Sequence, residues 1–364
     1  MKKIGIVTLS GYFNYGNRLQ NYALEQILNK KGYYVETLWI NPEQLQKISI
    51  KQKLKLLIKK NIVLFLFKKE GNFTGRRKYK NFKKFSIHHL NEKKHFNKSN
   101  DLPKRVADTF DYFIVGSDQV WNPFYTNSSN LYHLSFAPPQ KRIAYAASFG
   151  ISELPDDYKT VVQTYLPFFK NISIREEEGA KIIKELTGND VPIVLDPTLL
   201  LNREEWETIA IAPKNKPVRD YLVTYFLGSI SEEKQMYIEK MSQKYNLKVI
   251  ELAKKSDKDF YDTDPSGFVD LIKDASLLLT DSFHGTVFSI LFETPFIVFE
   301  RENKHGSMRS RIDTLLRVTE LESRNIENIN NFDEVLNINF SYAKSQLESE
   351  KNKSLDYLEK ALDI

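Results

Sequence analysis

The 364-residue sequence contains no cysteine and only six histidines. Without thiols the chain can form neither disulfides nor thiolate metal sites, which excludes a disulfide-stapled secreted scaffold. Five of the histidines fall in loops or in a basic segment, and none of them has the spacing of metal ligands. We therefore expect no metal. No cofactor is expected either.

Long apolar runs are also missing. The longest, residues 54–67, is interrupted by three lysines and an asparagine, so it falls short of the roughly 20 apolar residues of a membrane-spanning helix. The apolar stretch after Lys2 and Lys3 covers only about six residues, which is too short for a signal peptide. We therefore expect a cytoplasmic protein, with peripheral contact at the inner face of the membrane as an additional possibility.

The charge balance is modest. The chain carries 53 basic and 47 acidic residues, a formal net charge of +6 that is spread along the sequence. Such an even distribution gives no indication of nucleic-acid binding, but it suits a small anionic substrate. With 41% hydrophobic residues, a chain of this length is expected to form two hydrophobic cores, and hence two domains.

The order of apolar and polar segments predicts an α/β fold. Residues 1–40 read as a strand, a glycine-containing loop, a helix and a second strand, which is one βαβ unit. Residues 48–100 are basic and aromatic without a clear period, and we interpret them as a helical insertion. From Asp111 onward apolar strands again alternate with helices, as in buried parallel sheets.

The second half repeats this plan, with six apolar strands expected between residues 172 and 299. We place an N-terminal Rossmann-like domain at residues 1–168, on the acceptor side, and a donor-binding Rossmann-like domain at 169–335. A helix within 336–364 is expected to pack back on the first domain. Two parallel sheets would then face a cleft, where open α/β sheets bind ligands beyond the carboxyl ends of their strands.

Two polar clusters in the first domain follow predicted strands. In Gly11–Gln20 a strand-to-helix turn can present backbone N–H groups to an anion, although capping of a tight turn explains the same residues. In Gly116–Pro123 an aromatic ring stands beside hydrogen-bonding side chains, as in sugar sites; an N-cap and a core tryptophan are the alternative. The candidates for acceptor binding are Asn14, Asn17, Arg18, Gln119, Trp121 and Asn122, with Asp118 as a catalytic candidate.

Two further clusters lie in the second half. Arg175 ends the strand ISIRE, where its planar guanidinium suits a carboxylate or phosphate; a salt bridge to Glu176–Glu178 is the alternative. The segment TDSFHGT ends a buried strand and begins an apolar helix. His284 and Gly285 therefore lie at a helix N-terminus, where an imidazole can donate to an anion or act as a general acid, unless it only caps the helix.

Arginines also occur where the helix dipole disfavours them. Arg309 and Arg311 fall in the first turn of the helix predicted in 307–318, so a negative partner is required. An anionic ligand would be one such partner, and Asp313 in the same turn is another.

These residues resemble the polysaccharide pyruvyltransferases. The similarity rests on NYGNRLQNYAL, GSDQVWN, SIRE, LDPT and DSFHGTVFSILFETPFIVF with the basic SRIDTLL after it, and it covers nearly the whole chain except about 48–100. It implies two Rossmann-like domains similar to the GT-B glycosyltransferases, phosphoenolpyruvate as the donor and no metal.

The resemblance also implies roles for individual residues. Arg175 matches the family's donor-binding arginine, His284 its catalytic histidine, and Asp118 an aspartate implicated in the reaction. Some members carry a second arginine two residues before the histidine, where this chain has Ser282. Arg309 and Arg311 are the candidates for supplying that charge.

The expected reaction makes a pyruvate ketal on two hydroxyls of a sugar, which belongs to a cell-surface polysaccharide or a lipid-linked precursor. A glycosyltransferase that uses a nucleotide sugar is the alternative on the same fold. A non-catalytic sugar-binding protein, whose basic residues between Lys68 and Lys84 contact anionic lipid, is another. The sequence does not fix the oligomeric state.

Overall fold

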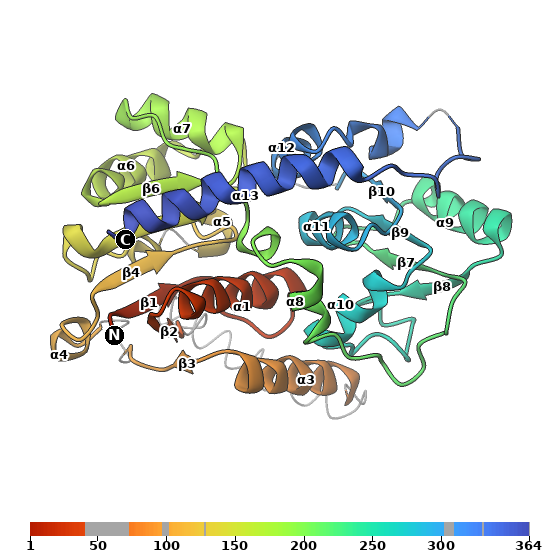
Figure 1. Cartoon of the computed structure of the whole chain (residues 1–364), viewed down its shortest axis with the longest axis horizontal. Helices are drawn as coiled ribbons and strands as arrows, with labels where there is room; N and C mark the ends of the chain where they lie inside the picture. The colour runs from red at the N-terminus through yellow and green to blue at the C-terminus, as the bar shows by residue number, and fades with distance from the viewer. Residues whose placement is uncertain (41–72, 97–101, 127–128, 302–308, 330, 364) are drawn as a thin grey trace, which may run out of the picture.

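The computed structural model describes residues 1–40, 73–96, 102–126, 129–301, 309–329 and 331–363. It contains two parallel β-sheets that lie side by side, with helices packed around each (Figure 1). Each sheet follows the strand–helix–strand order expected from the apolar runs of the sequence. The fold is therefore α/β, with two Rossmann-like domains in a GT-B-like arrangement.

The first sheet contains six parallel strands in the order β3-β2-β1-β4-β5-β6. Its central strands are buried apolar runs, as expected of parallel strands covered on both faces. Its strands are β1 (Lys3–Val7), β2 (Tyr34–Leu38), β3 (Glu92–Lys93), β4 (Tyr112–Val115), β5 (Arg142–Ala147) and β6 (Asn171–Ile174). Its helices are α1 (Tyr15–Lys30), α3 (Phe73–His89), α4 (Lys104–Ala107), α5 (Pro123–Thr126), α6 (Asp156–Tyr165) and α7 (Glu177–Thr187).

The second sheet contains four parallel strands in the order β10-β9-β7-β8. Its strands are β7 (Tyr221–Tyr225), β8 (Lys248–Glu251), β9 (Leu277–Thr280) and β10 (Phe296–Val298). Its helices are α8 (Arg203–Glu207), α9 (Glu232–Tyr245), α10 (Pro265–Lys273), α11 (Phe283–Phe292) and α12 (Ser310–Val318).

The division between the sheets differs from the sequence-based expectation. The strand expected to open the second domain, β6, pairs with β5 and so completes the first sheet. The apolar run around Ile193 forms a single bridge to Ile174 instead of a full strand. The second sheet therefore has four strands where six were expected, and the chain leaves the first domain after α7, later than the boundary placed at residue 168. Apolar runs show which segments are buried, but they do not show which sheet a segment joins.

One continuous hydrophobic core crosses from the first domain to the second. Tyr15 of α1 stacks on Phe268 of α10, with ring centroids 4.5 Å apart. Trp206 of α8 is fully buried and contacts Tyr22 of α1 on one side and Phe288 of α11 on the other. Aromatic contacts of this kind give a closely packed interface, so the carboxyl ends of the two sheets are held in a fixed relation.

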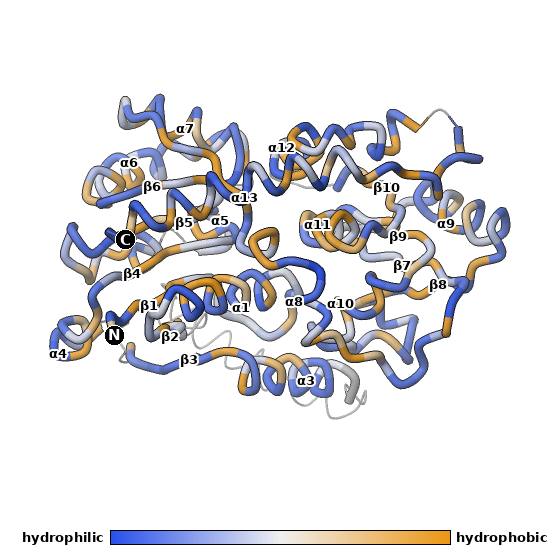
Figure 2. Tube along the Cα trace, in the orientation of Figure 1, coloured by the Kyte–Doolittle hydropathy of each residue, from blue (hydrophilic) through white to orange (hydrophobic). Residues whose placement is uncertain are grey.

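The C-terminal helix α13 (Ser341–Ala361) runs across both domains (Figure 1). Near its start Lys344 pairs with Glu293 of the second domain. Toward its end Tyr357 donates to the carbonyl of Ala144 in β5, and Glu359 pairs with Lys31. Blue and orange alternate along this helix in Figure 2, as expected when one face packs on the protein and the other faces water.

Part of the basic insertion is a well-packed helix. Phe82 and Phe85 on α3 are buried, and Lys78 lies over the rings of Tyr15 and Tyr261. Burial lowers the pKa of Lys78 to about 8, although Asp262 opposes the shift. Residues 48–72 and 97–100 of the insertion lie outside the described part of the chain. Within the described part, no helix is both long enough and apolar enough to span a membrane.

Candidate active site

The predicted catalytic histidine lies where the two domains meet. Ser282 caps α11 by accepting a hydrogen bond from the amide of Gly285 at 3.3 Å, which places His284 in the first turn of the helix. The imidazole packs directly on Gly16, in the first turn of α1. The starts of α1 and α11 therefore face each other, and their dipoles together favour negative charge at this point.

Arg175 follows β6 directly, and only 4% of its surface is exposed. Its Nη1 donates to Asp196, and it lies 3.3 Å from the Ser117 hydroxyl. Its Cζ lies 4.5 Å from the ring centroid of Phe283, the neighbour of His284. Arg175 belongs to the first sheet, contrary to the sequence-based expectation, but its side chain reaches the second domain. In the described part of the chain, its Nε and Nη2 atoms have no hydrogen-bond partner.

Asp118 lies beside Arg175. One of its carboxylate oxygens is 3.8 Å from Arg175 Nη2, and the other accepts a hydrogen bond from Asn17 at 3.4 Å. Its φ of +69° is unusual for a residue other than glycine and turns the chain sharply after β4. The structure thus brings Asp118, Arg175 and His284 together, as the sequence analysis expected.

A second arginine reaches the same place. Arg311, in α12, is buried, and its Cζ lies 5.9 Å from the ring centroid of Phe283. Burial and the neighbouring Arg175 lower the pKa of Arg311 to about 10. Arg175 and Arg311 line a cavity of about 40 Å³, which exceeds the roughly 10–15 Å³ that a single water needs.

Arg309 takes a different direction. Its guanidinium contacts Asp313 at 2.9 Å and Glu327 at 3.0 Å. The partner that the sequence analysis required for this arginine is thus a pair of carboxylates. Of the two arginines expected at the start of this helix, only Arg311 lines the interdomain cavity.

Two acidic residues of the site were not among the predicted site residues. Asp196 is 1% exposed and contacts Arg175, with one oxygen 3.7 Å from His284 Nε2. Burial alone would raise the pKa of Asp196, but Arg175 and His284 hold it well below its usual range. Glu176 is fully buried, and burial raises its pKa despite the nearby Arg175 and Arg311. The sequence signal for Asp196 was the motif LDPT, in which the aspartate directly follows a buried apolar run.

The expected sugar-binding cluster after β4 is turned inward. Trp121 is fully buried, donates its indole N–H to the carbonyl of Tyr132 and stacks on His133. Asn122 donates to the side chain of Gln119 at 2.8 Å. The prediction that Trp121 faces a sugar ring is therefore wrong, because the chain folds back and buries the ring in the core of the first domain.

The remaining acceptor candidates divide between the surface and the interior. Asn14 is exposed and caps α1 by accepting from the amide of Asn17. Arg18 is fully buried and bonded to Glu92, Asn17 and the carbonyl of Leu9, so it stabilises the fold and is not accessible to a substrate. Asn17 is the candidate that contacts the site, through Asp118.

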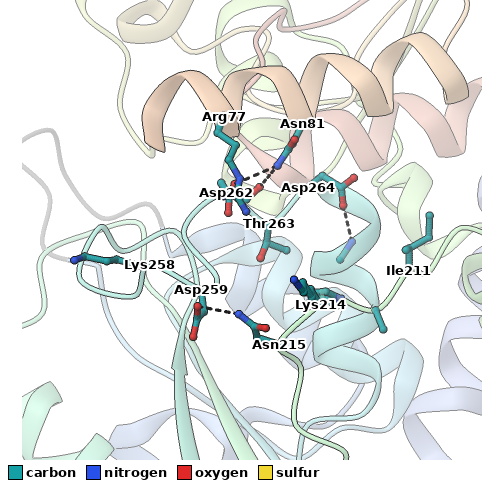
Figure 3. Close-up of a pocket in the computed structure, with 13 residues that line it drawn as sticks. Arg77, Asn81, Ile211, Lys214, Asn215, Lys258, Asp259, Asp262, Thr263 and Asp264 are labelled. Carbon is teal, nitrogen blue, oxygen red and sulfur yellow. Dashed lines mark hydrogen bonds and ion pairs between the residues drawn. The ribbon is translucent and has the colours of Figure 1, made fainter. Parts of the chain in front are cut away.

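A larger cavity of about 410 Å³ lies between α3 and the segment before α10 (Figure 3). Several of its polar groups are paired with one another: Asp262 with Arg77 and Asn81, and Asp259 with Asn215. Asp264, also on its wall, caps α10. Lys214, Lys258 and the hydroxyl of Thr263 also line this cavity, whereas the Arg175 site contains buried guanidinium nitrogens without a hydrogen-bond partner among the described residues.

In the part of the chain that the structure describes, no group of three or more His, Cys, Asp or Glu side chains could hold a metal ion. The site described above contains two guanidinium groups, an imidazole and buried carboxylates. Such a set can bind an anion and transfer protons.

Comparison with solved structures supports the fold. A protein from Listeria monocytogenes described as a UDP-N-acetylglucosamine 2-epimerase is 11% identical, with a TM-score of 0.50 over 100% of this chain and 97% of that one. The UDP-GlcNAc 2-epimerase of Methanocaldococcus jannaschii is 13% identical, with a TM-score of 0.46 over 98% and 100%. At 11% identity, the similarity to the first of these structures extends to the fold alone. No curated protein matches the chain in sequence.

The family comparison is more specific. The model of the polysaccharide pyruvyl transferase family matches residues 14–303, which include the start of α1, Asp118, Arg175 and His284. This range covers most of the chain and contains the charged groups gathered at the domain interface, Arg311 apart. The chain belongs to the polysaccharide pyruvyl transferase family.

Proposed function

We propose that the protein transfers the pyruvyl carbons of phosphoenolpyruvate to two hydroxyls of a sugar, in a cell-surface polysaccharide or its precursor. The products are a cyclic ketal and phosphate. One observation carries this proposal: Arg175, Arg311 and His284 converge from two domains, and the side chains of all three include a nitrogen without a hydrogen-bond partner among the described residues. Buried donors of this kind indicate a missing acceptor.

Phosphoenolpyruvate has the chemistry to satisfy these donors. It carries a carboxylate and a phosphate, and guanidinium groups bind both through paired N–H donors. The cavity between Arg175 and Arg311 has room for a small group such as a carboxylate. The meeting starts of α1 and α11 favour a second anionic group beside His284. The whole donor is larger than the cavity, so nearby side chains must move apart when it binds.

The departure at Ser282 is consistent with this arrangement. Ser282 uses its hydroxyl to cap α11, where some members of the family carry an arginine. In this chain Arg311 lies over the ring next to Ser282, and so supplies a second guanidinium from α12. Two arginines are therefore available to the donor, and the second comes from α12 instead of position 282.

The proposed reaction releases the protons of two hydroxyls, breaks one C–O bond and forms two. His284 gives a proton to the methylene carbon of the donor, which becomes the methyl group, and one sugar hydroxyl bonds to the central carbon. The bond from that carbon to the phosphate oxygen breaks, and phosphate leaves with its electron pair. A second hydroxyl then closes the ketal. Asp118 accepts the proton of one hydroxyl. Of the two hydroxyl protons, one restores the proton that His284 gave to the donor, and the other leaves with phosphate.

The experiment is a calorimetric titration of the protein with phosphoenolpyruvate. We expect wild-type protein to bind, and Arg175→Met and Arg311→Met each to weaken binding by about 10- to 100-fold, since each removes a charge-assisted contact. Arg309→Met is the matched control, because this arginine is engaged by Asp313 and Glu327. It should bind within about twofold of wild type.

The same titration separates the alternative activity. Binding of UDP-sugars without binding of phosphoenolpyruvate would favour a nucleotide-sugar transferase and overturn the proposal. Equal affinity in the wild type and both site variants would show that the donor binds elsewhere.

A further inference from the structure

Asp196 occupies an unusual position between the two domains. It belongs to neither sheet and begins a single 3-10 turn, Pro197–Leu199. Its two carboxylate oxygens have different partners. Oδ1 accepts from the backbone and the hydroxyl of Thr198, at 3.0 and 2.6 Å. Oδ2 accepts from the Ser117 hydroxyl at 2.7 Å and from Arg175, and lies 3.7 Å from His284 Nε2.

Only one of these oxygens has a local structural role. Capping the turn requires one acceptor, and asparagine caps as well as aspartate does. Oδ2 faces residues from the ends of β4 and β6 and from the start of α11. Keeping a buried carboxylate ionised is costly, and the structure compensates that cost with the charge of Arg175. Capping of the turn therefore does not explain why Oδ2 is ionised.

The backbone just before Asp196 is hydrogen-bonded to two other elements of the fold. The amide of Leu195 donates to the Ser354 hydroxyl of α13 at 2.9 Å. The carbonyl of the same residue accepts from the Tyr145 hydroxyl of β5 at 3.0 Å. Asp196 is consequently fixed by contacts that do not involve a ligand.

We propose that Asp196 is a positioning residue, which holds the Arg175 guanidinium and the His284 imidazole at a fixed separation across the domain interface. This inference rests on the proposed function and deepens it. Asp196 lines the same cavity as Arg175, but its two oxygens are already engaged by Thr198, Ser117 and Arg175. It orients Nη1 of Arg175 toward itself, so that Nε and Nη2 are left for the donor, and it keeps the imidazole of His284 beside them. A preorganised site of this kind loses little binding energy to side-chain ordering.

The test is the affinity for phosphoenolpyruvate in Asp196→Asn. The amide oxygen can still cap Thr198, which leaves the amide NH₂ facing Arg175, where a donor meets a donor. We expect binding to weaken by about 10- to 100-fold. The matched control is Asp264→Asn, the same change at a partly buried cap of α10, and it should bind as wild type does.

A double variant separates positioning from general loss of structure. If Asp196 acts through Arg175, Asp196→Asn should weaken binding by less than about threefold in an Arg175→Met background. If the effects of the two changes multiply in full, the positioning role is refuted. Should Asp196→Asn fail to fold, Ser117→Ala tests the same oxygen by removing one donor, with about 3- to 10-fold weaker binding expected; unchanged binding would count against the proposal.

The outcomes distinguish this inference from the function on which it rests. Wild-type protein that does not bind phosphoenolpyruvate overturns the proposed function. Wild-type binding with unchanged affinity in Asp196→Asn overturns the positioning role alone.

Discussion

The contact between Gly16 and His284 predicts that one added methyl group will disturb the site. A Cβ at position 16 would lie 1.9 Å from His284 Nδ1 and 2.3 Å from Cγ, whereas ordinary contact begins at 3.4 Å. In Gly16→Ala the imidazole or the domain interface must therefore move by about 1.5 Å, a displacement of the size that costs ~100-fold in catalysis elsewhere.

Two effects on stability oppose each other in Gly16→Ala. Overpacking costs about 1–3 kcal/mol, and alanine in place of glycine returns at most about 1 kcal/mol of helix stability. The expected net loss is about 0–3 kcal/mol. Thermal unfolding measures this loss, because 1 kcal/mol shifts the melting temperature by roughly 2–4 °C in a domain of 150–250 residues.

A double-mutant cycle with His284→Ala isolates the contact. Without the imidazole the clash disappears, so Gly16→Ala should become neutral or slightly stabilising, with a coupling of about 1–3 kcal/mol. Gly11→Ala is the matched control, because a Cβ there meets nothing within 4 Å. Equal destabilisation by Gly16→Ala in both backgrounds would refute the contact. This experiment needs no substrate, so it tests the geometry independently of the reaction.

Three further predictions concern the fold around the site. Trp121→Ala should lower the free energy of unfolding by about 3–5 kcal/mol, because the ring is fully buried, whereas a sugar-facing ring would cost far less. Burial lowers the pKa of His133 to about 4, so its contribution to the free energy of unfolding falls as pH decreases from about 6.5 to 4. In urea unfolding measured across this range, His133→Phe should remove that pH dependence. Burial raises the pKa of Glu25 to about 7, so its contribution to the free energy of unfolding falls as pH increases from about 4.5 to 7. Glu25→Gln should remove this opposite pH dependence. An unaltered pH dependence in either variant would contradict the corresponding assignment.

The fold follows from the sequence to a large extent, because buried parallel strands are continuous apolar runs. The strands β1, β4, β7 and β9 lie within the runs that predicted them. The sheet to which β6 belongs was not predictable, since strand pairing depends on contacts far along the chain. The segment around Ile193 is apolar like a strand, but Asp196 and Pro197 end it after a single bridge.

The candidate site was predictable where a side chain follows a strand or begins a helix. Arg175, Asp118 and His284 satisfy this rule, and they converge because strand ends and helix starts face the same interface. Trp121 follows the same rule and is buried, since its amide bonds to the carbonyl of Ser148 and the turn brings the ring inward. Arg309 and Arg311 are two positions apart on one helix, so only the packing of α12 shows which of them enters the site.

The structure also explains why the site depends on both domains at once. Arg175 and Asp118 come from the first sheet, and His284 and Arg311 come from the second domain. None of these pairs is close in sequence, so their separation is set by the packing between domains. That packing is apolar and shared, through Tyr15 on Phe268 and Trp206 on Tyr22. Because α13 contacts both domains and also holds the segment that carries Asp196, a change in this helix should reach the site even when it spares Glu350, which lines the cavity.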